Sequence, residues 1–136
     1  MERNISRWCA HLLALKRAHP VILHLGVYRI NGGCFGVTPG FPLTKSQRTV
    51  LGIAVATGNF VRDPRGEPSV IVGRATYVIE RKWQEKLSAR TEDSRTWLSA
   101  GSRGGYLVVG LAEAEGREQC DEVIEELLSA LTTSQA

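Results

Sequence analysis

The chain has 136 residues, 43% of them apolar, and a formal net charge of +3. This length and composition suit one folded domain with one core, spanning residues 1–136, and exclude a disordered chain. The apolar runs are too short to span a membrane. Three widely spaced cysteines argue against a disulfide framework and favour a reducing compartment such as the cytoplasm.

The charge is unevenly distributed along the chain. Residues 1–48 hold seven Lys or Arg and one Glu, whereas residues 113–126 hold seven acidic residues and one arginine. The basic part suits an acidic protein, an anionic lipid headgroup or nucleic acid as a partner. An ordinary solvated surface explains it equally well.

The first half of the chain predicts two helices with a pair of strands between them. The expected elements are a helix at 4–18, strands at 21–30 and 34–37 joined by the turn Asn31-Gly32-Gly33, a loop at 38–42 and a second helix at 48–57. His19-Pro20 stops the first helix. Thr44 and Gln47 have the spacing of a capping box, and Gly58 ends the second helix. The Thr, Val and Ile side chains of that helix also suit a strand.

The second half predicts about four strands and a closing helix. The expected elements are a surface loop at 62–68, strands at 69–80 and 83–90, a turn at 91–95, a hairpin over 96–113 with its turn at 101–105, a helix at 115–131 and a fraying tail at 132–136. Mostly antiparallel strands with helices on their faces define an α+β domain. Because the first and last helices lie at the two chain ends, we expect them side by side on one face of the sheet.

The closing helix raises a question about chemistry. Its apolar residues follow the spacing of one helix stripe, and they are Cys120, Val123, Ile124, Leu127, Leu128 and Leu131. The stripe therefore begins with a cysteine. Such a residue can be a nucleophile, a metal ligand or a small buried apolar side chain, and the choice depends on the fold.

The motifs of common enzyme and metal sites are missing from the sequence. No glycine-rich phosphate loop, Cys-x-x-Cys or His-Glu-x-x-His motif occurs. Cys9 and His11 are two residues apart on the first helix, so their side chains point in different directions and do not suit a nucleophile–base pair. His24 lies inside a strand and is interpreted as structural. We therefore expect no enzyme activity, no metal and no cofactor.

Several motifs, in the right order and spacing, resemble those of the profilin family. "SRWCAH" resembles the family's N-terminal helix, "GGCFGVTPGFP" resembles its "G-x-x-W-A-x-S-x-x-FP" stretch with Phe35 in place of the tryptophan, and "LTKSQRTVLGI" matches the helix that follows. "VIVGRATYVI" resembles its "GGxKYxVI" strand, and "EGREQCDEVIEELLSAL" resembles its closing "PGQCNxVVExLxxYL" helix. The resemblance covers nearly the whole chain. It implies a profilin-like fold, with a central antiparallel sheet and both terminal helices packed on one face.

The resemblance also implies a binding protein that acts on filament assembly. Profilins bind monomeric actin, and many also bind proline-rich segments and phosphoinositides. We therefore expect a cytoplasmic, cytoskeletal monomer that binds actin or an actin-like protein and no nucleic acid. In the family, actin is held by the late strands and the start of the last helix, opposite the terminal-helix face. The corresponding residues here are Lys82, Lys86, Arg90, Arg95, Arg117, Glu118 and Glu122. Cys120 takes the position of a buried cysteine of the family, where a free thiol serves as a small hydrophobe.

For proline-rich peptides, the resemblance predicts about half of a groove. The family holds a polyproline II helix between the terminal helices with a cluster of aromatic rings. The recognisable positions are Trp8, His11 and Phe35, with Leu127 from the last helix, where the family carries rings and this chain has none. We expect weak binding, in the high micromolar to millimolar range. It is equally consistent with the sequence that Trp8 and Phe35 only fill the core between the first helix and the sheet. Phosphoinositide binding, from the basic N-terminal part with Lys82, Lys86 and Arg90, is expected to be weak and electrostatic.

The chain also departs from the family pattern. Arg74 and Thr76 stand where the "GGxKY" strand has its second glycine and its lysine, and residues 80–103 form a longer, glycine-poorer segment. These departures indicate a divergent member, of a kind that the profilins of Asgard archaea also represent. A roadblock-type or sensor-like dimeric scaffold or ligand-binding domain has a similar order of elements and is the alternative. A monomer in solution favours the profilin, and a dimer favours the roadblock-type scaffold.

Overall fold

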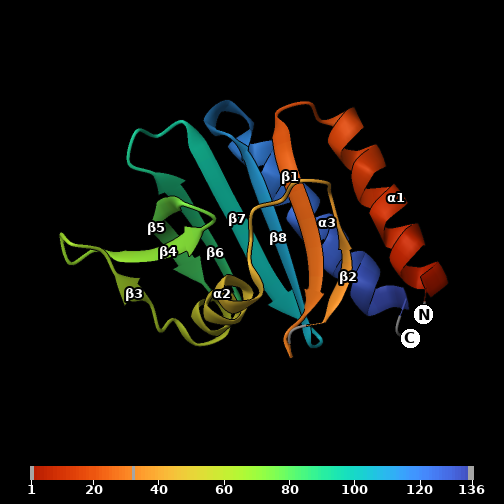
Figure 1. Ribbon diagram of the computed structural model, residues 1–136, viewed down its shortest axis with the longest axis horizontal. Coiled ribbons are helices and arrows are strands. Elements are labelled where there is room, and N and C mark those ends of the chain that lie inside the picture. Colours follow the sequence, from red (N-terminus) through yellow and green to blue (C-terminus); the bar gives the residue numbers. More distant parts are fainter. Residues whose placement is uncertain (1, 32, 135–136) are drawn as a thin grey trace.

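In the computed structural model, which describes residues 2–31 and 33–134, eight strands form one antiparallel sheet in the order β2-β1-β8-β7-β6-β5-β4-β3. Figure 1 shows this sheet and the helices that flank it. The elements are α1 (Glu2–Ala18), β1 (Ile22–Arg29), β2 (Cys34–Val37), α2 (Lys45–Thr57), β3 (Val61–Arg62), β4 (Pro68–Val72), β5 (Ala75–Trp83), β6 (Lys86–Thr91), β7 (Thr96–Arg103), β8 (Tyr106–Glu113), η1 (Ala114–Gly116) and α3 (Arg117–Ser134).

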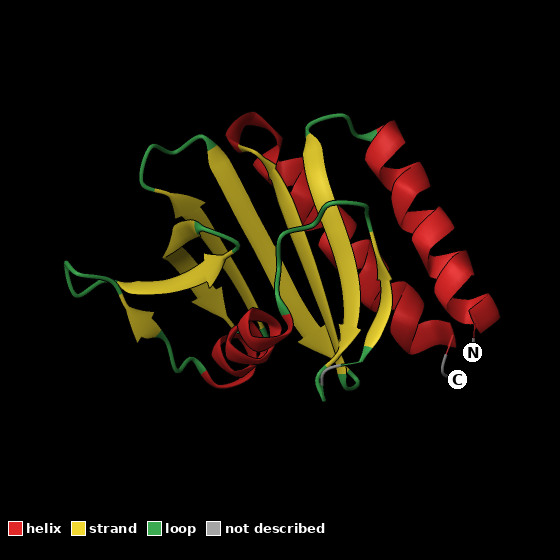
Figure 2. Ribbon diagram, in the orientation of Figure 1, coloured by secondary structure: helices red, strands yellow, loops and turns green. Residues whose placement is uncertain are grey.

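The helices form layers on opposite faces of the sheet. Figure 2 shows α3 behind β8 and β1 with α1 beside it, whereas α2 lies in front of the sheet. Each layer closes its own apolar core, one around Leu12, Leu25 and Ile124 and the other around Leu51 and Leu98. The structure thus confirms the predicted α+β arrangement and the placement of both terminal helices on one face.

Two glycines let the terminal helices approach the sheet closely. A Cβ at Gly36 of β2 would lie 2.9 Å from the Trp8 Cβ and 3.1 Å from the backbone nitrogen of Cys9. A Cβ at Gly110 of β8 would lie 3.0 Å from the Cys120 Sγ. These separations are shorter than the optimal contact between carbon atoms. The absence of a side chain at both positions is therefore what allows α1 and α3 to dock.

Local signals set both ends of α2. The Thr44 Oγ1 accepts a hydrogen bond from the Gln47 N–H at 3.2 Å, and the Gln47 Oε1 accepts one from the Thr44 N–H at 3.1 Å, which completes the predicted capping box. Gly58 ends the helix with a φ of 77°, a left-handed conformation that glycine adopts without strain. Gln47 also forms two 2.9 Å hydrogen bonds with the backbone of Gly73. The helix prediction for this segment is confirmed, and its cap ties α2 to the sheet.

The prediction of a single strand at 69–80 is wrong. The chain turns at Gly73 and Arg74, so that β4 pairs back onto β5 as a hairpin. Gly73 has a φ of +63°, which a residue with a side chain adopts only with strain. Within residues 58–116, all of which the structure describes, six strands form in place of the four or so expected.

Several element boundaries also differ from the prediction. The corrected boundaries are Trp83 as the end of β5, Lys86 as the start of β6, a turn of only Gly104 and Gly105 between β7 and β8, and Ser134 as the last described residue of α3. Arg62 and Pro68, at the two ends of the predicted loop at 62–68, belong to β3 and β4 and pair with each other. Thr132, predicted to fray, is helical and donates a hydrogen bond to the Leu128 carbonyl at 3.0 Å. Gly32 of the predicted turn and residues 135–136 of the predicted tail lie outside the described residues. None of the described helices is long and apolar enough to cross a membrane.

Candidate partner-binding surfaces

The sheet face that carries α1 and α3 is only partly covered by them. α3 packs on β7 and β8, and α1 packs on β1 and β2. The strands at the left of Figure 1 extend beyond both helices. We call the remaining part of this face the open half-face, and strand register assigns to it Val61, Ser69, Ile71, Thr76, Val78, Arg81, Trp83, Lys86, Ser88 and Arg90.

The pairing of β6 with β7 shows which side of the sheet this surface is on. Lys86 lies opposite Gly101, and a Cβ at Gly101 would lie 2.7 Å from a side-chain carbon of Leu128 in α3. Residues that face each other across antiparallel strands point to the same side of the sheet. Lys86 therefore faces the α3 side, and so does its other cross-strand neighbour, Trp83.

A β-bulge changes which side chains of β5 share that face. Just before Arg81 the pairing of β5 with β6 shifts, and Glu80 is the extra residue. Beyond the bulge, Arg81 and Trp83 face the α3 side. Lys82 faces the α2 side, because its partner Leu87 belongs to the core beneath α2.

A shared carboxylate fastens α3 to the edge of the open half-face. Glu125 forms ion pairs with Lys86 and with Arg103, whose Nη2 lies 3.0 Å from the Glu125 Oε1. The hydrogen bond from Lys86 holds the pKa of Glu125 below its ordinary value, and the hydrogen bond from Arg103 acts in the same direction. One turn earlier, the Trp97 indole N–H donates a hydrogen bond to Asp121 at 3.1 Å. The flank of α3 that borders the open half-face is therefore acidic.

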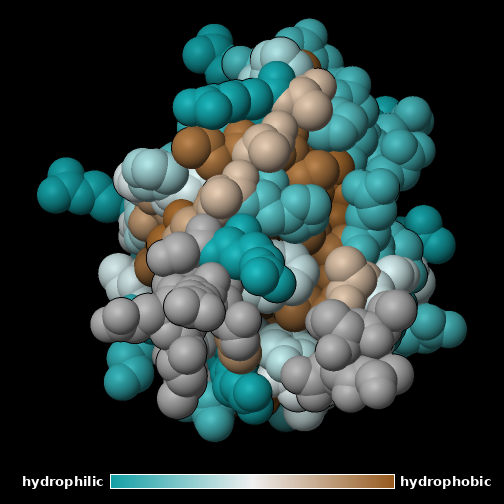
Figure 3. All heavy atoms as spheres, turned by 90° about the vertical axis from the view of Figure 1, so that its right-hand side faces the viewer, coloured by the Kyte–Doolittle hydropathy of each residue, from teal (hydrophilic) through white to brown (hydrophobic). Residues whose placement is uncertain are grey.

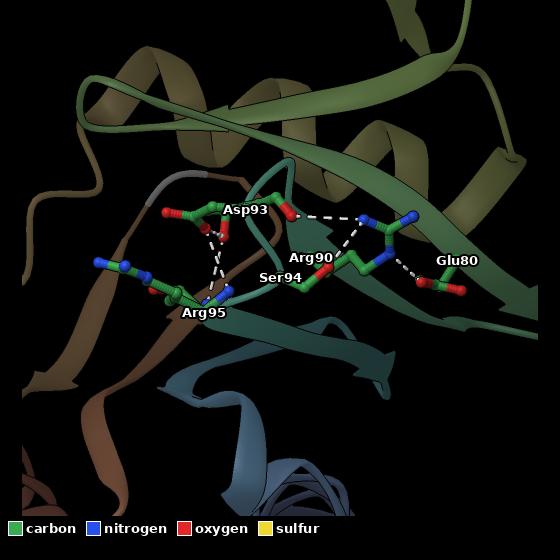
Figure 4. Close-up of polar contacts among 7 residues, drawn as sticks. Glu80, Arg90, Asp93, Ser94 and Arg95 are labelled. Carbon is green, nitrogen blue, oxygen red and sulfur yellow. Dashed lines mark hydrogen bonds and ion pairs between the residues drawn. The ribbon is translucent and has the colours of Figure 1, made fainter.

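A second ion pair lies farther along β6, at the end where β7 begins. Figure 4 shows Arg90 pointing toward Glu80 on one side and Ser94 on the other. Asp93 accepts hydrogen bonds from the hydroxyl of the last β6 residue at 2.6 Å and from the Arg95 N–H at 3.1 Å. These two hydrogen bonds, the first more than the second, lower the pKa of Asp93. The β6–β7 turn is therefore held by its own side chains.

The structure brings together only part of the predicted actin-binding set. Lys82 points to the α2 side and donates a hydrogen bond to the Gln84 carbonyl. Lys86 and Arg90 share the face of the terminal helices, so the expectation that the set lies opposite that face is wrong for them. The members on the open half-face, in the adjoining turn or at the start of α3 are Lys86, Arg90, Arg95, Arg117, Glu118 and Glu122.

Two residues of the open half-face that the sequence prediction did not name, Arg81 and Trp83, are in contact with each other. Arg81 lies over the ring of Trp83, with its Cζ 4.4 Å from the ring centroid. Arg81 is exposed and Trp83 is half-buried. The available signal was an arginine between the two predicted strands and a tryptophan at the start of the second, but their common face depends on the bulge.

Of the residues predicted for a peptide groove, Trp8 and His11 lie on α1 and Phe35 lies on β2. The rings of Trp8 and His11 meet edge to face with their centroids 5.7 Å apart, and His11 is exposed while Trp8 is half-buried. Phe35 is half-buried and meets the ring of Tyr106 with a centroid distance of 5.3 Å. Tyr106 is only 3% exposed and belongs to the core. Leu127 is only 1% exposed, so the structure places it in the core and not on the groove.

The side of the molecule that carries α1 is not uniformly polar. Figure 3 shows hydrophobic surface there between hydrophilic side chains. On the same side, Arg29 lies over the rings of Phe35 and Tyr106, with its Cζ 5.1 and 5.4 Å from their centroids. Aromatic rings and an arginine plane offer flat surfaces to a ligand that is itself rigid and extended.

Cys120 is a core residue. It is 0% exposed and packs on Gly110, and burial raises the pKa of its thiol. A nucleophile or metal ligand needs the thiolate form and access to its target, and this environment supports neither. Among residues 2–31 and 33–134, no group of three or more His, Cys, Asp or Glu side chains is arranged to hold a metal ion.

Comparisons with known proteins agree with this architecture. No protein family and no curated protein matches the chain by sequence. Among solved structures, profilin IB of Acanthamoeba castellanii matches with a TM-score of 0.78 at 14% identity, over 95% of this chain and 99% of that one. Rat profilin 2a matches with a TM-score of 0.73 at 12% identity, over 97% and 99% of the two chains. LokiProfilin1, solved in complex with rabbit actin, matches with a TM-score of 0.74 at 11% identity, over 98% and 97%.

At such low identities the likeness concerns the fold. The chain therefore has a profilin-like fold, as its motifs predicted. It is a divergent example, because its sequence shares little with these neighbours.

Proposed function

We propose that this chain binds actin monomers and regulates filament assembly, as a single-domain monomer of the cytoplasm and cytoskeleton. The observation that carries the proposal is the match of its fold to two profilins that were solved in complex with rabbit actin. The open half-face, on which Ser69 and Ser88 are buried and the other side chains are half-buried or exposed, and the adjoining start of α3 offer such a partner a surface. The role is one of binding and not of catalysis.

The charges of this surface suit protein recognition. Lys86 and Arg90 lie on its strands, where they pair with Glu125 and Glu80. Glu118 and Glu122 are exposed on α3. A surface with both signs side by side selects its partner by complementary charge and speeds association. A bound actin monomer would be withdrawn from spontaneous nucleation.

Polymerisation of rabbit actin with increasing amounts of the chain tests the proposal. We expect nucleation to slow as the chain is added. Lys86→Glu combined with Arg117→Glu should weaken this effect, whereas Arg7→Glu, at an exposed residue of α1, should not. Thermal unfolding of the double variant checks that its fold is intact. Unchanged nucleation with wild-type chain in large excess contradicts the proposal for that actin.

A weaker, second function is favoured by the Trp8–His11 pair. Rings that are partly exposed on α1 can stack on the prolines of a preformed polyproline II helix. Because Leu127 is buried and supplies no ring, we propose affinity in the high micromolar to millimolar range. Titration of a proline-rich peptide should shift amide signals around Trp8 and Phe35, and Trp8→Ala should abolish the shifts. Low-micromolar affinity, or shifts far from these residues, contradicts this placement.

We also propose weak electrostatic binding of phosphoinositides. Lys16 and Arg17 line a hollow of about 290 Å³ at the end of α1. A basic residue near an anionic membrane contributes about 1 kcal/mol, and salt screens the attraction. Co-sedimentation with phosphoinositide vesicles should therefore fall as the salt concentration rises. Binding that is unchanged in high salt contradicts the mechanism.

A further inference from the structure

The open half-face carries an aromatic side chain that the fold does not use for its cores. Trp83 is the last residue of β5 and lies opposite Lys86. It is half-buried and belongs to neither apolar core. A tryptophan contributes most when its large ring is removed from water. Part of that contribution is still available to a partner.

Arg81 holds this ring in a defined position. The 4.4 Å separation between its Cζ and the ring centroid is a cation–π contact. Both side chains point to the same face because they are two residues apart beyond the bulge. The contact orders the two side chains before a partner arrives, which lowers the entropy cost of binding.

Charge indicates what chemistry the partner brings. Lys86 is paired with Glu125, and Arg90 is paired with Glu80. Among the described residues, Arg81 has no carboxylate partner. A carboxylate on the partner would complement it, because the edge of a guanidinium can donate hydrogen bonds while its plane stacks on the ring.

We infer that Trp83 and Arg81 form the anchor of the partner-binding surface, with an apolar side chain of the partner on the ring and a partner carboxylate on Arg81. This inference rests on the proposed function, so the occupant is an actin monomer. Tryptophan and arginine carry a large share of binding energy at protein interfaces. The neighbouring ion pairs, already satisfied within the chain, then exclude water around the anchor.

Calorimetric titration of the full chain with rabbit actin monomers tests the anchor. Trp83→Ala and Arg81→Glu are each expected to weaken the affinity by about tenfold or more. Trp83→Phe, which keeps a flat ring, should recover most of the affinity. Arg7→Glu on α1 is the matched charge reversal and should stay within about twofold of wild type.

The outcomes separate the inference from the proposed function. Absence of binding by the wild-type chain overturns the proposed function and the anchor together. If the wild type binds and Lys86→Ala weakens binding, while Trp83→Ala and Arg81→Glu stay within about twofold, only the anchor is overturned. Thermal unfolding of each variant controls for folding. If Trp83→Ala does not fold, the affinity of Arg81→Glu decides whether the anchor holds. The Arg81 side chain is exposed, so its replacement should leave the fold intact.

Discussion

The two halves of one sheet face carry different side chains for different reasons. Where α1 and α3 cover the sheet, Gly36, Gly101 and Gly110 lie at positions that a side chain would have to share with a helix. On the open half-face, the large side chains of Arg81 and Trp83 point outward instead. In these strands, glycine stands where a helix occupies the space of a side chain. The covered half therefore builds the fold, and the open half is free to recognise a partner.

The largest effect is expected from a side chain added in the covered half. In Gly36→Val the new Cβ would lie 2.9 Å from the Cβ of Trp8 and 3.1 Å from its carbonyl carbon, so α1 has to move. We expect the free energy of unfolding to fall by about 3 kcal/mol, measured by urea denaturation. Thr76→Val, on the open half-face, should change it by no more than about 0.5 kcal/mol. Equal losses at the two positions would remove the distinction between the halves.

The next largest effect is expected on binding, from a comparison of lysines on the two faces of β5 and β6. Lys86 lies on the open half-face and Lys82 on the α2 side. Lys86→Ala should weaken affinity for actin by about threefold to tenfold, because it removes a charge from the surface proposed to meet the partner. Lys82→Ala should change it much less. A larger loss at Lys82 would show that the partner binds the α2 side, and calorimetric titration distinguishes the two.

Glu125 lies at the boundary between the two halves, and its contribution to the free energy of unfolding should depend on pH. The folded chain holds the pKa of Glu125 below its ordinary value, so this carboxylate stabilises the fold above that ordinary value and loses its contribution as pH falls through the folded-state pKa. Its side chain is 42% exposed, which limits the contribution to about 0.5–1 kcal/mol.

Glu125→Gln should therefore lower the free energy of unfolding at about pH 7, and the difference from wild type should shrink at about pH 3. Glu126→Gln, at the exposed neighbouring residue, is the control. A gap between Glu125→Gln and wild type that widens in acid would contradict the assignment. Urea denaturation at the two pH values measures it.

The elements that the sequence predicted well are those with local causes. The capping box at Thr44 and Gln47 and the glycine at 58 define α2 through contacts within a few residues. The apolar stripe from Cys120 to Leu131 predicted α3 and its buried face. Such signals do not depend on what packs against them, so they can be identified without the fold.

The β4–β5 hairpin could not be predicted in the same way. Its turn, Gly73-Arg74, lies inside an apolar run that continues on both sides. The dipeptide is not among the strong turn signals. What holds the turn is distant in sequence, since Gln47 of α2 bonds both backbone groups of Gly73.

The side chains that share the open half-face could not be predicted from the sequence either. Alternation from Val78 without a bulge would place Glu80 and Lys82 on the α3 side and Arg81 on the other side. The extra residue at Glu80 reverses this order, because a shift of one residue moves every later side chain to the opposite face. The sequence alone therefore does not show that Arg81, and not Lys82, lies on the open half-face, and only the pairing with β6 does.

The smallest effect is expected at the outer part of the open half-face. Ile71 is 47% exposed, whereas its neighbour Val70 is 1% exposed and belongs to the core beneath α2. Ile71→Thr keeps a β-branched side chain and should lower the free energy of unfolding by no more than about 0.5 kcal/mol. Val70→Thr places a hydroxyl in the core and should cost about 1–2 kcal/mol. Urea denaturation of the two variants measures the difference. An equal cost at Ile71 would mean that this side chain is covered in solution, for example by a second copy of the chain, and size-exclusion chromatography of the wild type would then show a dimer.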